Sequence, residues 1–399
     1  MKALLLVIDG LGMGAMPDVS LLNRPQDIGA NTFATIKRHG RADYPFLESL
    51  GISNLLGTTK LLVKGLGIKK GLSLLHYEGA DAYAGHLEMI GSQVSIEPTF
   101  LEGARASLFR ALKSHGEVVE KKSVIILDAA IFISNNVESE PGYSINVIGS
   151  LQRVGFEKVL EVGNLVRKII KKVPRVIVMG GTPLDESRVL ASLEKRKNLK
   201  NQRFFSGVNV SRTGIFNDHY VVAHLGLSLK RGFNLLKLLA KKNYEVALVG
   251  KTATLFNFPF GRKYTQNNTD KVFEIVKQEY LRMRAGLIFA NVSELDLAGH
   301  EQDISKGVKI LKKIDNFVST FLSELEENDI FMLTADHGND PAVGHSQHTR
   351  EMVPIILAGK KIVPGNLGTR KSLSDIGCTL ANLFGLGQTE MGESFLAHS

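Results

Sequence analysis

The chain has 399 residues, of which 44% are hydrophobic and 22% are charged. This balance is ordinary for a globular protein and excludes global disorder, and the length predicts two domains. With 49 basic and 40 acidic residues, the formal net charge is +9. The basic residues are scattered, Trp is absent and no zinc-knuckle spacing occurs, so we expect no nucleic-acid partner.

No apolar run approaches the roughly 18 residues that span a bilayer, so we expect no membrane association. Residues 3–8 begin like a signal peptide, but the run is short and Asp9 follows it instead of a small-residue cleavage site, which favours a buried strand. The single cysteine, Cys378, excludes an internal disulfide framework and fits a reducing compartment. We therefore expect a cytoplasmic protein.

Short apolar runs alternate with longer helical patterns along the chain, which predicts an α/β fold with a mostly parallel, doubly wound sheet. The runs are apolar throughout, as is typical of strands covered on both faces. The predicted strands are residues 3–8, 123–127, 175–179, 245–249, 287–290 and 330–334, and the clearest predicted helices are residues 270–284, 304–326 and 372–384.

The middle of the chain has its own strand and helix signals but few residues of the kind that bind metals. We therefore expect residues 1–96 and 213–399 to form one core and residues 97–212 to form a smaller α/β domain inserted into it. No internal repeat and no low-complexity linker is present.

Asp and His residues gather in segments at the two ends of the chain, directly after predicted strands. Because the carboxyl ends of parallel strands meet at one edge of a sheet, these residues are expected to converge in space. Two divalent ions about 4 Å apart need roughly six anionic or imidazole ligands. The candidates are three carboxylates and three imidazoles: Asp9, Asp296, His300, Asp336, His337 and His348.

Each candidate also has a simpler explanation. Asp9 is in a position typical of a turn former, and Asp296 with His300 has the i,i+4 spacing of a pair on a helix surface. Asp336 and His337 are adjacent between Ala335 and Gly338, which is a poor surface pattern. The set of six is much more specific than any member.

These segments resemble the phosphopentomutases, a branch of the alkaline phosphatase superfamily that includes the cofactor-independent phosphoglycerate mutases. The resemblance runs in order from residue 3 to beyond residue 390 and is weakest in the middle. The motifs that carry it are Asp9-Gly-Leu-Gly-Met-Gly-Ala-Met-Pro-Asp18, Asp27-Ile-Gly-Ala-Asn31, Gly85-His-Leu-Glu88, Tyr244-Glu-Val-Ala-Leu-Val-Gly-Lys251, Thr334-Ala-Asp-His-Gly-Asn-Asp340 and His348-Thr-Arg-Glu351. It implies an alkaline-phosphatase-like core that holds two manganese-type ions on the six candidate residues, a cap domain, and interconversion of ribose 1-phosphate and ribose 5-phosphate.

One departure concerns the nucleophile. The family places a phosphorylated threonine four residues before the histidine of its Gly-His motif, and Ala82 stands there in this chain. A methyl group has no lone pair and cannot hold a phosphoryl group, so the usual covalent route is closed at this residue.

Other departures concern substrate contacts. Met179 stands where the family has an arginine, Gly214-Ile215-Phe216 replaces its Pro-Asn-Arg, and Asp128 is one place away from its aspartate. Losing guanidinium groups weakens recognition of a phosphate dianion. Lys251 and Arg212 remain as candidate phosphate partners, although either fits a solvated surface cation equally well. Asp296 and His300 have the spacing of phosphoglycerate mutases, one residue shorter than in phosphopentomutases.

Three functions stay open. The chain is a phosphopentomutase-like enzyme acting on a small phosphorylated substrate with manganese, zinc or magnesium; or a phosphohydrolase in which a hydroxide on the metal replaces the threonine; or a non-catalytic protein that binds a phosphate ester. A substitution engineered at position 82 would be a simpler explanation, but it would not account for the lost arginines. We expect a monomer or a small homo-oligomer.

Overall fold

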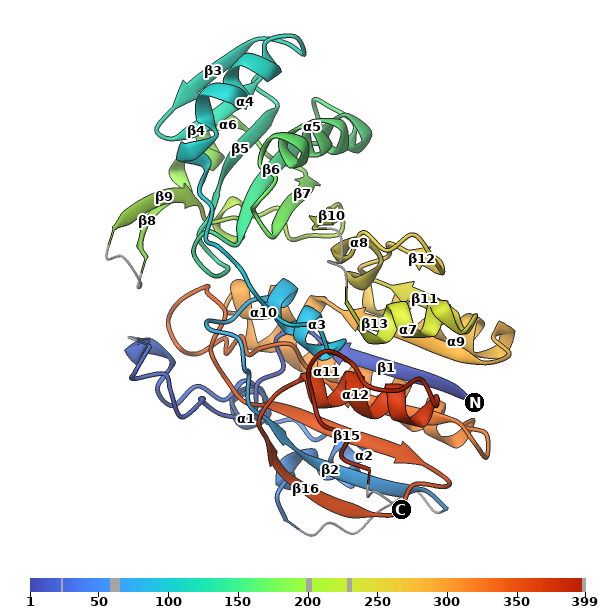
Figure 1. Ribbon diagram of the computed structural model, residues 1–399. Helices are drawn as coiled ribbons and strands as arrows, with labels where there is room; N and C mark the ends of the chain where they lie inside the picture. Colours follow the sequence, from blue (N-terminus) through green and yellow to red (C-terminus); the bar gives the residue numbers. More distant parts are fainter. Residues whose placement is uncertain (23, 58–64, 199–202, 228–231, 397–399) are drawn as a thin grey trace. The chain divides into compact units, whose positions relative to one another are not determined.

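The structure is a computed structural model, and it describes the chain except residues 23, 58–64, 199–202, 228–231 and 397–399 (Figure 1). The chain divides into two compact units. The first comprises residues 1–94, 230–253 and 258–399, and the second comprises residues 95–229 and 254–257. Each unit is built on its own sheet, and the α/β class is confirmed.

The first unit contains an eight-stranded sheet with β1 (Lys2–Ile8) in its interior. Strand β1 pairs in parallel with β13 (Gly286–Val292) and β14 (Ile330–Thr334), which brings segments 284 and 327 residues apart side by side. All residues of these three strands are buried, as their continuous apolar runs predict. The full order is β12 (Arg262–Tyr264), β11 (Glu245–Val249), β13, β1, β14, β15 (Val353–Gly359), β2 (Gly67–Ser73) and β16 (Gly365–Arg370).

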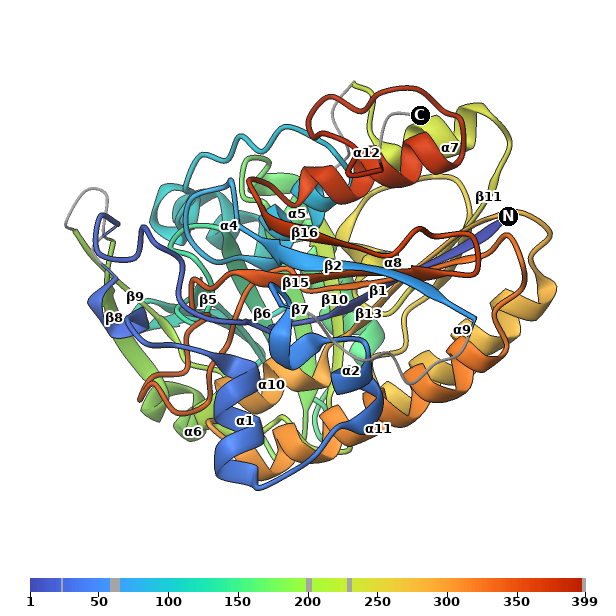
Figure 2. The same cartoon turned by 90° about the horizontal axis from the view of Figure 1, so that it is seen from below.

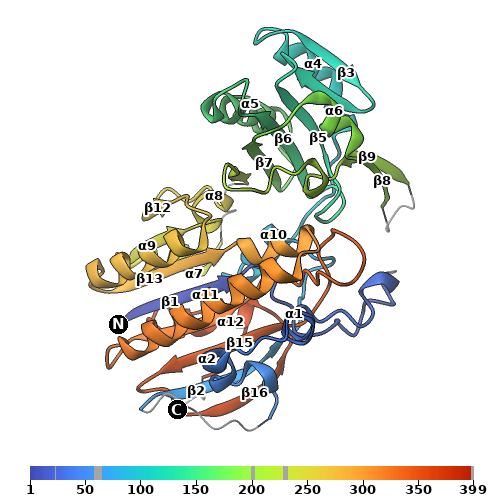
Figure 3. The same cartoon turned by 180° about the vertical axis from the view of Figure 1, so that it is seen from behind.

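Helices cover both faces of this sheet, as a doubly wound sheet requires (Figures 2 and 3). On one face lie α7 (Leu235–Lys241) and α12 (Ser374–Leu383), which contact each other. On the other face α11 (Ile304–Ser323) contacts α1 (Thr32–Gly40), α2 (Pro45–Ser49) and α9 (Thr269–Arg282). The predicted helix at residues 372–384 begins two residues later than expected, with Leu373 as its N-cap.

The second unit is a separate α/β layer. Its sheet has the order β10 (Val221–Gly226), β7 (Arg175–Gly181), β6 (Ser144–Ser150), β5 (Ile131–Asn136), β4 (Val124–Leu127) and β3 (Val118–Lys121), and β9 (Phe204–Val208) joins β5 to β8 (Leu193–Lys197). Among the residues that the structure describes, most of its strand pairs are antiparallel, and only β6 with β7 and β5 with β9 run in parallel. Helix α5 (Phe156–Ile169) packs on β6 and β7 around an aliphatic core.

Strand β10 changes the expected boundary between the units. The sequence predicts residues 213–229 in the core, whereas β10 pairs along its whole length with β7 and so belongs to the second sheet. The second unit therefore extends to residue 229. The roles of core and cap for the two units stay predictions.

Candidate metal centre

The predicted ligands converge at one edge of the first sheet because of the register of its strands. Val7 pairs with Thr334, and Ile8 pairs with Val292, so β1, β13 and β14 end at the same level. Asp9 follows β1 directly, and Asp336 lies two residues after β14. Helix α10 (Glu294–His300) begins two residues after β13 and carries Asp296. The central expectation, that distant carboxylates and imidazoles meet at a sheet edge, is met.

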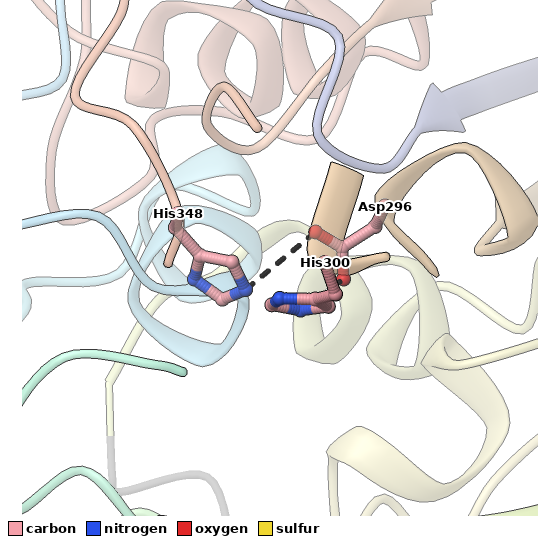
Figure 4. A group of neighbouring side chains, drawn as sticks. All are labelled: Asp296, His300 and His348. Carbon is pink, nitrogen blue, oxygen red and sulfur yellow. Dashed lines mark ion pairs between the residues drawn. The ribbon is translucent and has the colours of Figure 1, made fainter. Parts of the chain in front are cut away.

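One group consists of Asp296, His300 and His348 (Figure 4). All three side chains are buried, and one ligand atom from each lies within 4.8 Å of the others. Nε2 of His300 is 3.3 Å from Oδ2 of Asp296, and Nε2 of His348 is 3.5 Å from Oδ1 of the same carboxylate. Asp296 therefore stands between two imidazoles that come from different segments.

A second group consists of Asp9, Asp296 and His337, again all buried. Nε2 of His337 lies 3.7 Å from Oδ1 of Asp9 and 3.4 Å from Oδ2 of Asp336. These three atoms, Nε2 of His337, Oδ1 of Asp9 and Oδ2 of Asp336, are buried and make no hydrogen bond in the described part of the chain, although Oδ2 of Asp336 also lies 3.3 Å from Nδ1 of His86. Leaving buried polar atoms unpaired costs about 1–3 kcal/mol each, so a cation that accepts all three lone pairs fits this place.

Backbone carbonyls orient the three imidazoles. Nδ1 of His348 lies 2.9 Å from the Ala80 carbonyl, Nδ1 of His300 lies 2.6 Å from that of Ser346, and Nδ1 of His337 lies 3.1 Å from that of Gly338. A carbonyl only accepts, so we assign the proton of each neutral ring to Nδ1 and leave Nε2 as the metal-facing lone pair. Histidines that bind metals usually donate their other ring N–H to such an acceptor.

Burial and neighbouring charges shift the acidities in the centre. Burial, together with the nearby Asp336 carboxylate, raises the pKa of Asp9 to about 6. Burial also opposes ionisation of Asp296, but the imidazoles of His300 and His348 hold its pKa well below the usual range. Burial, together with the nearby His337 imidazole, lowers the pKa of His348, which favours its neutral form.

The three other predicted site residues lie in different surroundings. Lys251 is 5% exposed, forms an ion pair with Asp9 and has its Nζ 3.9 Å from Asp296, so it is no solvated surface cation. Ala82 is fully buried as the first residue of α3 (Ala82–Met89), behind the N-cap Asp81. Arg212 lies in the second unit, is 66% exposed and pairs with Glu194 at 2.8 Å. Substrate contact by Lys251 and Arg212 stays a prediction.

Two asparagine amides that the sequence did not indicate hold the carboxylates. Asn291 donates from Nδ2 to Asp9 at 2.8 Å and turns its Oδ1 to His86 Nε2, also at 2.8 Å. Asn339 donates to Asp296 at 2.8 Å. Asn339 lies in the motif of residues 334–340, which also contains two candidate ligands. For Asn291, the position at the end of a predicted strand is the one sequence feature that could have indicated its role.

Comparison with known proteins places the chain in a family. A family model described as the Metalloenzyme superfamily matches residues 1–388. A phosphopentomutase of Symbiobacterium thermophilum is 30% identical to this chain and covers 99% of it, with 97% of the relative aligned. The chain belongs to the phosphopentomutase family of the metalloenzyme superfamily.

A second curated relative has the same name. A phosphopentomutase of Alkaliphilus oremlandii is 28% identical over 99% of this chain and 98% of the relative. Among solved structures, a phosphoglycerate mutase of Leishmania mexicana aligns over 98% of this chain and 96% of that chain, at 13% identity and a TM-score of 0.46, which is too low to carry an argument. Within the described residues, none of the helices of this metalloenzyme has the length and apolarity to cross a membrane.

Proposed function

We propose that this protein is a phosphopentomutase-like metalloenzyme that acts on a phosphorylated sugar or a similar small phosphate ester with two divalent ions. The observation that carries the proposal is the convergence of three buried atoms that make no hydrogen bond, on Asp9, Asp336 and His337, beside the Asp296, His300 and His348 group. The names of the relatives support the substrate class. Manganese is the proposed metal, because mixed imidazole and carboxylate sets suit manganese or zinc better than magnesium.

The metals would supply charge stabilisation for a phosphoryl group held between attacking and leaving oxygens. The protein's own residues prepare for this. The Nδ1 partners aim the imidazoles, and Asn291 and Asn339 hold Asp9 and Asp296. Lys251 adds an ammonium beside the carboxylates, and a phosphate dianion is an anion that such a cation recognises.

Residue 82 decides between a mutase and its alternatives. Its methyl group cannot accept a phosphoryl group, and the Asp81 side chain already accepts from the backbone N–H groups of Tyr83 and Ala84. The second candidate function is therefore a phosphohydrolase in which water takes the place of the missing hydroxyl. The third is a protein that binds a phosphate ester without turning it over. The buried alanine at this position is the observation that favours both alternatives over a full mutase.

The test uses purified protein loaded with Mn²⁺ and a panel of sugar phosphates that includes ribose 1-phosphate and ribose 5-phosphate. Isomerisation, release of inorganic phosphate and binding by calorimetry are measured in parallel. We expect the Ala82→Thr variant to gain isomerisation, and phosphate release by the wild type would assign the hydrolase. Ala84→Ser, a hydroxyl two residues along the same helix, is the matched control. If the protein neither turns over nor binds any sugar phosphate of the panel, the proposal is contradicted.

The remaining parts of the proposal concern the whole chain. We propose that the second unit is the cap that contributes Arg212 to substrate binding, and that the protein is a monomer or a small homo-oligomer. Arg212→Gln is then expected to weaken sugar phosphate binding without changing Mn²⁺ binding, because Arg212 belongs to the unit that lacks the candidate ligands. Equal loss of both would contradict this assignment.

A further inference from the structure

The loop of residues 75–81, which connects β2 to α3, is held by side chains instead of by regular secondary structure. Glu88 accepts hydrogen bonds from the backbone N–H groups of His76 and Tyr77, at 3.1 and 3.0 Å. The Tyr77 hydroxyl donates to the Asp336 carbonyl at 2.8 Å. The loop leads directly into Ala82, the first residue of α3.

Arg350 contacts three carbonyls of this loop. Its guanidinium donates to the carbonyls of Leu75, Tyr77 and Gly79, at 3.1, 2.8 and 2.6 Å. Its Nε and Nη2 form a bidentate pair with the carboxylate of Asp18, at 2.8 and 2.7 Å. An arginine has five N–H donors in a fixed plane, and here each has an acceptor.

The next carbonyl of the loop is the one that orients a candidate metal ligand. Ala80 presents its oxygen to Nδ1 of His348, 2.9 Å away, which leaves Nε2 toward Asp296. The carbonyls of Leu75, Tyr77 and Gly79 thus point to Arg350, and that of Ala80 points to the imidazole two residues before Arg350. Arg350 is 2% exposed, so water does not compete for these acceptors.

We propose that Arg350 is a positioning residue whose guanidinium holds the 75–81 loop in the conformation that aims His348 at the metal centre and sets residue 82 at the start of α3. A lysine cannot replace it, because an ammonium has three donors and lacks the planar fork that reaches a carboxylate and three carbonyls together. The part of the inference that concerns metal binding rests on the proposed function; the part that concerns the loop does not.

The test compares wild type, Arg350→Lys and the milder Asp18→Asn, which keeps the guanidinium but removes the charge of its carboxylate partner. Hydrogen exchange is measured on the metal-free full chain, for peptides that cover residues 74–84 and for the buried strand β13 as an internal reference. Mn²⁺ affinity is measured by calorimetry. Arg262→Lys is the matched control, because Arg262 also pairs with carboxylates, Glu279 at 2.6 Å and Glu245 at 2.8 Å, but in β12, at the far edge of the sheet from β2.

We expect exchange in residues 74–84 to rise at least tenfold in Arg350→Lys with the β13 peptide unchanged, and Mn²⁺ affinity to fall about 10- to 100-fold, the usual effect of losing an outer-shell partner. Asp18→Asn should shift both in the same direction by less, and Arg262→Lys should shift neither. Unchanged exchange in the loop, or a rise shared equally by β13, would overturn the positioning role. If the wild type binds Mn²⁺ and Arg350→Lys binds it equally well, the link to His348 is overturned; a wild type that binds no Mn²⁺ overturns the proposed function instead.

Discussion

Glu351 couples the stability of the metal-free protein to pH. Its carboxylate is fully buried and accepts from the hydroxyls of Thr32 and Thr349, at 2.7 and 2.6 Å, and from the backbone N–H groups of Thr32 and Gly14, at 2.9 and 3.1 Å. Burial nevertheless raises the pKa of this group from 4.5 to about 7, with the hydrogen bonds opposing the shift. As pH rises, the folded protein therefore keeps the Glu351 proton up to a higher pH than the unfolded chain does.

The magnitude follows from the two pKa values. Because the folded-state pKa lies above the unfolded value, stability falls as pH rises, from about pH 4.5 until the loss is complete above about pH 7. Each pKa unit corresponds to about 1.4 kcal/mol, so ionising Glu351 lowers the free energy of unfolding by about 3 kcal/mol over this window. Glu351→Gln removes this titration while the other titrating groups remain in both proteins.

The assay is urea unfolding of metal-free wild type and Glu351→Gln at several pH values between 4.5 and 8. We expect the wild type to lose about 3 kcal/mol relative to the variant across the range. Glu393→Gln is the control, because the side chain of Glu393 is 80% exposed, and it should follow the wild type at every pH. A difference between wild type and Glu351→Gln that does not change with pH, or that changes with the opposite sign, would refute the reasoning.

Two further predictions concern Gly12, which lies beside Glu351, and the candidate metal ligands Asp296 and His300. A Cβ at Gly12 would lie 2.1 Å from the carboxylate carbon of Glu351, so Gly12→Ala should lower the free energy of unfolding by about 1–3 kcal/mol in urea, whereas Gly103→Ala, with no atom within 4 Å of the added carbon, should change it little. Asp296 belongs to both ligand groups and His300 to one, so calorimetry should show loss of tight Mn²⁺ binding in Asp296→Asn but loss of one equivalent in His300→Ala. Equal stoichiometry in the two variants would contradict the division into two overlapping groups.

The strands that carry the centre could be predicted from the sequence because they are buried on both faces. A strand such as β1 can be predicted without knowing its neighbours, because its sequence is a continuous apolar run after Lys2 and all of its residues are buried. The position of Asp9 directly after such a run then indicates the edge where a ligand binds. The six candidate ligands followed from this rule and from the resemblance of the motifs.

Strand β2 shows where the pattern fails. Lys69 and Lys70 interrupt its apolar run, and the run was not predicted as a strand. In the structure Lys70 is buried and its ammonium donates to the Asn54 carbonyl at 2.6 Å. A lysine that is buried because a distant carbonyl accepts from it cannot be told from a surface lysine by sequence.

The sequence by itself determined the α/β class, the apolar strands and the residue types able to bind a metal, because each depends on local composition and spacing. Only the tertiary structure decided which atoms face one another: Lys251 beside Asp9, Asn291 on the same carboxylate, and Arg350 across the 75–81 loop. These contacts join segments that lie about 240 to 280 residues apart, and their geometry depends on strand register and helix packing that no single segment encodes.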